Sequence, residues 1–427
     1  MRNMGTKSLK LLKEHLNMRN SMEEIKLFNE KKDCCFCQAC INVCPTNAIE
    51  IQHDEYGFEY PQINKNKCIS CRQCINTCHY QKDDKQTSLK ETYAASSFDI
   101  DVLQSASGGI FSSLAQSIIK QGGLVYGSAM IYEDNQLNVK HICVDNLNDL
   151  NKLKGSKYVQ SNVGHIYKDI KNVLKQGQLV LFSGTPCQVD GLYGYLKKKY
   201  DNLFTIDIIC HGVPSQQFFQ SYIQYNETKK NKKIIDYKFR DKNQGWKLYG
   251  KIIYLDNPPS YEYFEPEESS YYQMFLNSYT YRENCYSCPY ASDKRPADIT
   301  IGDYWCIDLV HPKYLTDNEG LLDEKKGVST LIVNNDHGKH LIEKYGEGLI
   351  KYPSTYKNAY QYNKQLIQPS MLKEERKIVL DMYKNNGYEK VEQWYQKRLA
   401  KYKRKRKIIS LIPRSIKDII KKIIGKK

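Results

Sequence analysis

The sequence lacks any apolar run that approaches the ~20 residues needed to span a bilayer. Its first residues, MRNMGTKSLKLLKEHL, place charge inside the apolar pattern, so they do not form the continuous hydrophobic region of a secretory signal. The GxGxxG fingerprint of dinucleotide-binding folds is absent too. We therefore expect a cytoplasmic protein that works in a reducing compartment.

Cysteine, in contrast, is plentiful. The chain has 427 residues, enough for about two to four domains, and 41% of them are hydrophobic, which favours a folded protein. Fifteen cysteines are present, an odd number. In a reducing compartment such a set indicates metal sites rather than disulfides.

The positive charge is concentrated at the C-terminal end. Lys and Arg number 64 against 48 Asp and Glu, a net charge of +16. Residues 397–427 hold 14 basic residues and one Asp, which leaves 64 − 14 = 50 basic and 48 − 1 = 47 acidic residues over 1–396. The remaining net charge of +3 over residues 1–396 does not indicate a nucleic-acid partner. A membrane surface is the partner that this segment favours.

The tail itself is a basic amphipathic pattern. After the run KRKRK at 403–407, isoleucines recur at three- and four-residue steps between Ile412 and Ile424, with lysines between them. This pattern predicts peripheral contact with an anionic membrane, on the inner face of the cell membrane. The alternatives are a helix that docks on its own domain and a solvated tail.

The order of patterns predicts a sequence of regions along the chain. It runs from an N-terminal helical segment to a cysteine-dense domain, a polar linker, a domain of alternating strands and helices, a helical extension and the basic tail. The predicted bounds are 1–33, 34–80, 81–90, 91–350, 351–396 and 397–427.

The cysteine-dense region is an internal repeat with a shift of 34 residues. Both halves read C-x2-C-x2-C-x3-C, and an alternating pattern around HDEYG between them predicts a hairpin. This is the bacterial ferredoxin pattern, in which two four-iron clusters share eight thiolates and the fourth cysteine of each motif ligates the other cluster. The first cluster takes Cys34, Cys37, Cys40 and Cys78. The second takes Cys68, Cys71, Cys74 and Cys44.

A pair of structural zinc sites is the alternative, and a disfavoured one. Zinc fingers pair two C-x2-C knuckles and gain nothing from a third and fourth thiol at these offsets. His79 stands where the second motif would usually carry proline, which shapes a turn but supplies no ligand. Cys35 is interpreted as an unligated neighbour.

The sequence pattern of the next domain, residues 91–350, predicts an α/β fold with a partly parallel sheet. QLVLFS (178–183) and LFTIDII (203–209) read as strands around a helix that starts with Thr185 and Pro186. Such a βαβ unit has parallel strands, so Cys187 and Cys210 should lie at the carboxyl edge of the sheet.

Four cysteines in this domain form a further candidate metal site. Cys285 and Cys288 form a C-x2-C pair, and with Cys187 and Cys210 they could hold a third four-iron cluster or a zinc ion. From the residues alone, a four-iron cluster and a zinc ion are equally favoured at this site. Cys143, in an alternating stretch, is interpreted as a non-ligating buried cysteine that packs as a small apolar residue.

Two polar segments are candidates for binding an anionic cofactor. Ser107, Gly108 and Gly109 precede a helix with apolar residues on one face, and a helix start exposes N–H groups to an anion. The turn LKGSKYVQS at 153–161 could touch a phosphate. By itself the glycine turn favours a plain helix start over an anion site, and 153–161 is a surface loop.

Seven motifs in order resemble one family. SASGGIFSSLA, KGSKYVQS, FSGTPCQVDGL, DIICHGVPS, FRDKNQGW, CYSCPYA and RPADITIGDYW are similar to the coenzyme F-420 (deazaflavin) hydrogenase/dehydrogenase beta-subunit family, with the ferredoxin domain fused in front. The resemblance spans roughly residues 30–340. Family members often have glycine after the Trp of GDYW, where this chain has Cys306, interpreted as a spare thiol.

The resemblance implies FAD and a third 4Fe-4S cluster in the catalytic domain. Matched by motif, the third cluster would use Cys187, Cys210, Cys285 and Cys288, which favours iron–sulfur over zinc there. Ser107, Gly108, Gly109 and Lys157, Tyr158, Val159, Gln160 become the flavin candidates. His211 is the candidate proton donor, with a hydrogen bond to the cluster as its alternative role, and Asp303 and Arg295 are read as structural.

A flavin also fits the number of electrons that the clusters and the substrate exchange. Clusters pass single electrons whereas most organic reductions need two, and a flavin joins the two kinds of chemistry. We therefore predict an iron–sulfur flavoprotein oxidoreductase between a ferredoxin-like partner and a small-molecule substrate. Some bacterial relatives accompany cell-surface polysaccharide genes, which makes that metabolism one candidate. Deazaflavin oxidoreduction, an electron-transfer subunit with no substrate site, and a zinc-dependent nucleic-acid module are the alternatives.

Overall fold

The computed structural model describes residues 25–82, 91–98, 101–246 and 248–411. Most of the predicted N-terminal helix (1–33), linker (81–90) and distal tail (412–427) lies outside the described residues. Within the first region only the short η1 (Lys31–Asp33) is seen. None of the helices in the described part of the chain is long and apolar enough to cross a membrane.

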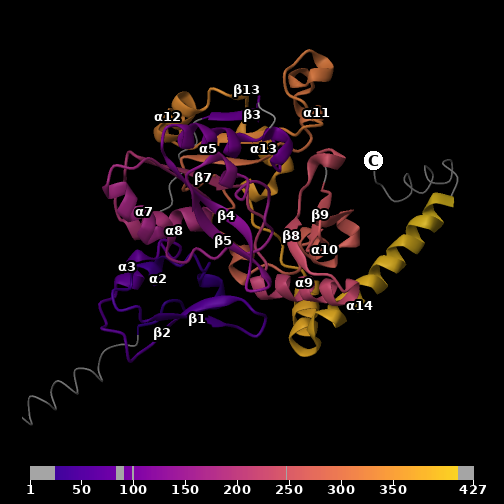
Figure 1. The fold of residues 1–427 in the computed structure, drawn as a ribbon, viewed down its shortest axis with the longest axis horizontal. Coiled ribbons are helices and arrows are strands. Elements are labelled where there is room, and N and C mark those ends of the chain that lie inside the picture. Colours follow the sequence, from indigo (N-terminus) through magenta and orange to yellow (C-terminus); the bar gives the residue numbers. More distant parts are fainter. Residues whose placement is uncertain (1–24, 83–90, 99–100, 247, 412–427) are drawn as a thin grey trace, which may run out of the picture.

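The cysteine repeat forms a small unit with internal symmetry. The helices α2 (Ala39–Val43) and α3 (Gln73–Thr77) are related by the same shift of 34 residues as the cysteines. Between them the antiparallel hairpin of β1 (Ile49–His53) and β2 (Glu59–Ile63) confirms the predicted turn. In Figure 1 this indigo unit lies at one end of the molecule, below α7 and α8.

The central domain is built on one mixed sheet. Its strand order is β13-β3-β12-β11-β7-β6-β4-β5, and the pairs β4/β6, β6/β7 and β7/β11 are parallel. The predicted α/β class with a partly parallel sheet is confirmed. The strands are β3 (Glu91–Ser97), β4 (Leu124–Glu133), β5 (Gln136–Val144), β6 (Val180–Gly184), β7 (Leu203–Ile208), β11 (Ile299–Asp303), β12 (Ser329–Val333) and β13 (Leu349–Ser354).

Helices cover both faces of this sheet because its central strands are apolar on both sides. Along β6, Leu181 contacts the core beneath α5 (Ile110–Lys120) and α12 (Asp336–Tyr345), whereas Val180 and Phe182 contact the core beneath α7 (Ile166–Lys175) and α8 (Pro186–Leu196). Successive strand side chains point to opposite faces, so one strand serves both cores. The smaller helices are α4 (Asp101–Gln104), α6 (Leu147–Leu150), α11 (Ile307–Val310) and α13 (Tyr356–Tyr362).

A second layer lies beside the sheet and was not predicted. It consists of an antiparallel three-stranded sheet with three helices around a core rich in Tyr and Phe. The elements are β8 (Ile234–Lys238), β9 (Gly250–Tyr254), β10 (Ser260–Phe264), α9 (Gln216–Lys230), α10 (Ser270–Leu276) and α14 (Glu374–Leu411). The yellow α14 ends far from the body of the molecule (Figure 1).

Two predicted region boundaries fall inside elements. Position 350 lies within β13, which pairs with β3 and so extends the main sheet to Ser354. Position 397 lies within α14, a helix bent at Gly387, whose φ of 73° is one that glycine adopts without steric cost. The charge change at 397 therefore does not coincide with a structural boundary.

Candidate redox site

The two halves of the cysteine repeat share an unusual backbone conformation. Phe36 and Gln38 have φ values of 55° and 66°, and their counterparts Ser70 and Arg72 have 57° and 56°. Residues with side chains seldom adopt left-handed φ. In the second half, the curled loop directs the Ser70 N–H to Cys68 Sγ at 3.4 Å. The curled loop thus holds the sulfur of a predicted ligand against a backbone donor.

The first predicted ligand set comes together below α8, and we name it the inner set. It consists of Cys34, Cys37, Cys40 and Cys78. Burial, and then the neighbouring Cys37, raise the pKa of the Cys78 thiol to about 11. Burial likewise raises the pKa of Cys40, followed by the contributions of Cys37, Cys34 and Cys78. The thiols of this set thus lie close enough to repel one another as thiolates.

The second predicted set lies at the surface, and we name it the outer set. Its members line one cavity, together with Ile49 and Ile63 of the hairpin. Cys71 is exposed. The Ala48 N–H donates to Cys44 Sγ at 3.2 Å, so the fourth cysteine of the first motif is held on this side. The set consists of Cys44, Cys68, Cys71 and Cys74.

Four of the other seven cysteines converge at the carboxyl edge of the sheet, and we name them the third set. Cys187 is in the first turn of α8, Cys210 follows β7, and Cys285 and Cys288 belong to or follow the short η4 (Glu283–Ser287). Burial raises the pKa of Cys210, and Cys285, Cys187 and Cys288 add to this effect. The predicted βαβ unit is confirmed and places the first two as expected.

The spacing of these thiols bears on which metal group they fit. Among the described residues, no group of three or more His, Cys, Asp or Glu side chains is close enough to hold a single metal ion. The sets nevertheless interact electrostatically, and in the repeat the left-handed loops curl around them. A cubane holds its four thiolates farther apart than one ion does, because each thiolate binds a different iron.

Cys35 lies between the inner and third sets. Its side chain is buried, and the neighbouring Cys187 and then Cys37 raise its pKa. It therefore lies near one member of each set. That Cys35 is an unligated neighbour of the ligands stays a prediction.

A part-buried ion pair joins Arg240, which the sequence did not single out, to Asp303, which was interpreted as structural. Arg240 Nη1 donates to Asp303 Oδ2 at 3.0 Å, and Trp246 Nε1 donates to Asp303 Oδ1 at 3.2 Å. Trp246 stacks on Trp305, and the Arg240 guanidinium lies 5.5 Å from the centre of the Trp305 ring. Burial would lower the pKa of Arg240, but Asp303 raises it overall. Arg240 Nη2 is buried without a partner among the described residues.

The glycine turn is tied to this ion pair through a lysine. Lys242 Nζ donates to the carbonyls of Val102, Ser107 and Lys326, and burial lowers its pKa to about 7. Gly108 has no room for a side chain, because a Cβ there would lie 2.5 Å from the Ala95 carbonyl oxygen. Gly109 caps α5 with a φ of 81° and no capping side chain, so the first-turn N–H groups lack that partner.

The residues of loop 157–160 contact three different parts of the molecule. Lys157 Nζ donates to the carbonyls of Lys152, Leu153 and Lys154, and burial lowers its pKa to about 7. Tyr158 stacks on Phe275, and Val159 is buried in the same aromatic core. Gln160 instead faces the cysteine repeat, where it donates to the Cys35 carbonyl at 3.0 Å.

The remaining candidates have structural surroundings. His211 is half-buried, and desolvation lowers its pKa against the opposing effect of Asp303, while its carbonyl accepts from Ser370. Arg295 forms a buried ion pair with Asp207 at 2.6 Å. His79 contacts Asp190 at 3.1 Å.

Two of the other cysteines also have defined positions. Cys143 is exposed on β5, an edge strand, so the expectation that it is buried was wrong. The alternating pattern correctly predicted a strand, but the side chain of Cys143 lies on its exposed face rather than its buried face. Cys306 has a φ of 56°, a left-handed conformation that favours glycine.

Together, the fold and the cysteine sets define an iron–sulfur electron-transfer protein of the oxidoreductase type. Residues 33–82 match the 4Fe-4S dicluster domain, and residues 177–352 match the model for the C terminus of the coenzyme F420 hydrogenase/dehydrogenase beta subunit. The chain therefore joins a dicluster domain, which carries two 4Fe-4S clusters, to a domain of the F420 hydrogenase/dehydrogenase beta-subunit family. This confirms the resemblance drawn from the seven motifs.

Individual proteins add little to this assignment. A chain of the F420-reducing NiFe hydrogenase complex from Methanosarcina barkeri, in a xenon-derivatised structure, is 17% identical. The match covers 74% of this chain and 93% of that chain, with a TM-score of 0.37. No match was found among functionally curated proteins.

Proposed function

We propose that this protein is an iron–sulfur flavoprotein oxidoreductase in which electrons pass from the outer set to the inner set, then to the third set and a flavin. The observation that carries the proposal is the position of Cys35, which is buried near Cys37 of the inner set and Cys187 of the third set. Two cysteine sets joined through one side chain favour a continuous electron path. The third set then holds a 4Fe-4S cluster.

The outer set is the proposed point where electrons arrive. Cys71 is exposed, and Ile69 beside it is 63% exposed. An apolar side chain next to an exposed ligand is suited to contact with a ferredoxin-like redox partner. The inner set lies behind it against α8, so it suits relay rather than exchange with a partner.

FAD is the proposed flavin, near the pair Arg240–Asp303. Arg240 Nη2 is a buried donor without a protein partner among the described residues, which suits an anionic or carbonyl group of a ligand. The α5 N-terminus at Gly109 suits a phosphate. When bound, a flavin exchanges single electrons on one side and electron pairs on the other. His211, beside Cys210, remains the proposed proton donor.

The substrate is proposed at the level of its class. The Lys-, Asn-, Ile- and Tyr-rich composition is typical of AT-rich bacterial genomes, and many such bacteria are not expected to use the deazaflavin coenzyme. This favours another small metabolite, within cell-surface polysaccharide synthesis, over deazaflavin itself. An assay with each class of acceptor separates the two.

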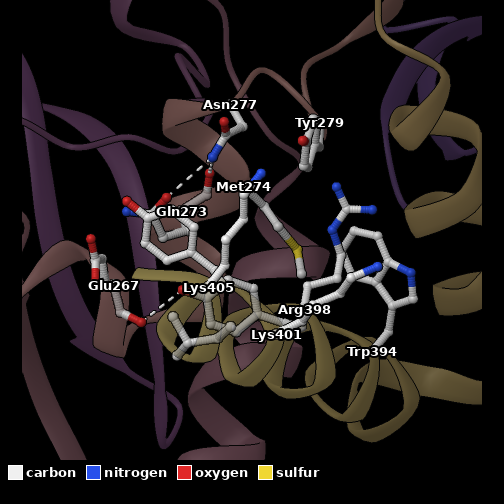
Figure 2. Close-up of a pocket in the computed structure, with 12 residues that line it drawn as sticks. Glu267, Gln273, Met274, Asn277, Tyr279, Trp394, Arg398, Lys401 and Lys405 are labelled. Carbon is white, nitrogen blue, oxygen red and sulfur yellow. Dashed lines mark hydrogen bonds between the residues drawn. The ribbon is translucent and has the colours of Figure 1, made fainter. Parts of the chain in front are cut away.

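Contact with an anionic membrane is the proposed role of the C-terminal region. Figure 2 shows a groove between α10 and α14 where Lys401, Lys405 and Arg398 lie beside Trp394 and Tyr279. Basic side chains favour anionic lipid headgroups and Trp favours the membrane interface. Unchanged membrane fractionation after deletion of 397–427 would remove this part of the proposal.

The experiment for the flavin is a content analysis of the anaerobically purified full chain. We expect about one FAD per chain, released by heat and identified by chromatography, and its loss in Arg240→Met with the iron content retained. Arg398→Met, an exposed arginine of α14, is the matched control and should keep its flavin. Wild-type protein without flavin or reductase activity would support the second candidate, an electron-transfer subunit with no substrate site.

A further inference from the structure

Arg282 is a fully buried cation without a carboxylate partner in the described part of the chain. Its relative exposure is 0%, and it immediately precedes η4, which carries Cys285. Nε donates to the Cys34 carbonyl at 3.0 Å and Nη1 donates to Gln160 Oε1 at 3.3 Å. Nη2 has no hydrogen-bond partner among the described residues. All its acceptors are thus neutral.

Aromatic rings surround the rest of this guanidinium. It lies 3.9 Å from the centre of the Tyr60 ring and 5.6 Å from that of Phe36. Glu59, on the same hairpin, is a carboxylate close enough to be affected by Arg282, yet it pairs with His53. A ring face offsets only a small part of the cost of burying a charge.

The location of Arg282 indicates which negative charge balances its buried guanidinium. Arg282 Nε donates to the carbonyl of Cys34, a member of the inner set, at 3.0 Å. The Arg282 carbonyl accepts from the N–H of Cys285, a member of the third set, at 3.0 Å, so this residue adjoins both sets. Four thiolates and four sulfides give a four-iron cluster a net negative charge, so both sets suit an unpaired cation between them.

We propose that Arg282 is the shared counter-charge of the inner and third sets and raises the reduction potentials of both clusters. An electron that enters a buried cluster adds negative charge in a medium of low dielectric constant, and a fixed cation beside it offsets that cost. The outer set lies at the surface, where solvent serves this purpose. The third-set half of this inference rests on the proposed function, and the inner-set half rests on the dicluster domain.

The test is a redox titration of the iron-loaded full chain, followed by electron paramagnetic resonance. In Arg282→Gln we expect the equilibrium constant for one-electron reduction to fall at least tenfold for the inner and third clusters, a shift of about 59 mV for each. The outer cluster should keep its potential. Arg282→Lys keeps the charge and should restore most of the shift, and Lys339→Gln, at an exposed position of α12, should leave all three potentials unchanged.

A second variant keeps the test decisive where Arg282→Gln loses its iron. Gln160→Glu places a carboxylate beside Nη1 and should lower the same two potentials. Unchanged potentials in an iron-loaded Arg282→Gln or Gln160→Glu protein would overturn the proposal. Loss of iron in all three variants, including the charge-retaining lysine, would also overturn it, because shape rather than charge would then be required.

The iron count separates this inference from the proposed function. A wild-type protein with about eight irons would remove the third cluster and leave the inner cluster as the test of Arg282. A protein with about twelve irons and unchanged potentials would remove the role of Arg282 and leave the electron path.

Discussion

The two halves of the cysteine repeat have the same ligand spacing, but the loops between their first three cysteines have opposite surroundings. In the first half, Cys35 is 4% exposed, and Phe36 and Ala39 are buried. At the equivalent positions of the second half, Ile69 is 63% exposed, and Ser70 and Gln73 are exposed. The ligand pattern therefore fixes the kind of metal group, while the residues between the ligands fix what each half can contact.

The first half is buried because it docks on α7 and α8. Asn42 Nδ2 donates to the Gly164 carbonyl at 2.8 Å, and the Gly164 N–H donates to Gln38 Oε1 at 2.7 Å. Gly191 of α8 faces Cys37 so closely that a Cβ would lie 2.8 Å from its Sγ. Removal of ligands and of these contacts should separate the roles of the two halves.

Loss of one ligand in each half should have the largest effect. Cys40→Ser should remove the inner cluster, about four irons, and stop electron transfer from the surface to the third set. Cys71→Ser should remove the outer cluster and leave the inner and third signals in place. Iron analysis with electron paramagnetic resonance measures both, and equal loss of all signals from Cys71→Ser would contradict the separation.

The next largest effect is expected from a substitution that fills the space between α8 and the cysteine repeat. A Cβ on Gly194 would lie 2.3 Å from the Thr77 carbonyl oxygen, so Gly194→Val forces the repeat away from α8. Overpacking of this kind costs about 1–3 kcal/mol. The free energy of unfolding in denaturant measures it, and a value equal to wild type would show that the two domains do not meet here.

A smaller effect is expected from the equivalent asparagines. Asn42→Ala loses buried hydrogen bonds to the carbonyls of Gln38 and Gly164 and should destabilise the fold by about 1–3 kcal/mol. Asn76→Ala, its exposed counterpart, should stay within about 0.5 kcal/mol of wild type. Similar losses for the two variants would mean that the halves are equally buried.

The smallest change in stability is expected at the exposed end. Ile69→Ser should leave the free energy of unfolding within about 0.5 kcal/mol, because the side chain is mostly in solvent. Its reduction by a small ferredoxin should slow, since the apolar contact beside Cys71 is removed. An unchanged rate would place the partner elsewhere on the surface.

Local patterns were predictable where neighbouring residues decide the structure. The 34-residue repeat, the hairpin and the unit from β6 to β7 follow from spacing within short segments. Arg282 and Arg240 were not found, because their partners lie far away in sequence: Arg282 reaches Cys34, and Arg240 reaches Asp303. FRDKNQGW, which holds Arg240, was a recognised motif, so its charged residues were the available signal.

The aromatic second layer shows the same limit. Its core joins residues from Leu137 to Val391, so no single segment contains the pattern. The face of Cys143 could not be inferred either, since an alternating strand does not tell which side is covered. The two sets of the repeat could be predicted from sequence because each cysteine motif carries its own spacing, whereas the third set was predicted as a cluster site only through the family resemblance.

The iron content of the anaerobically purified full chain tests the central claim most directly. Wild-type protein should hold about twelve irons per chain, and Cys187→Ser should hold about eight, with the outer and inner signals unchanged. This result would assign Cys187 to a third cluster at the end of the electron path. About eight irons in both proteins would contradict it.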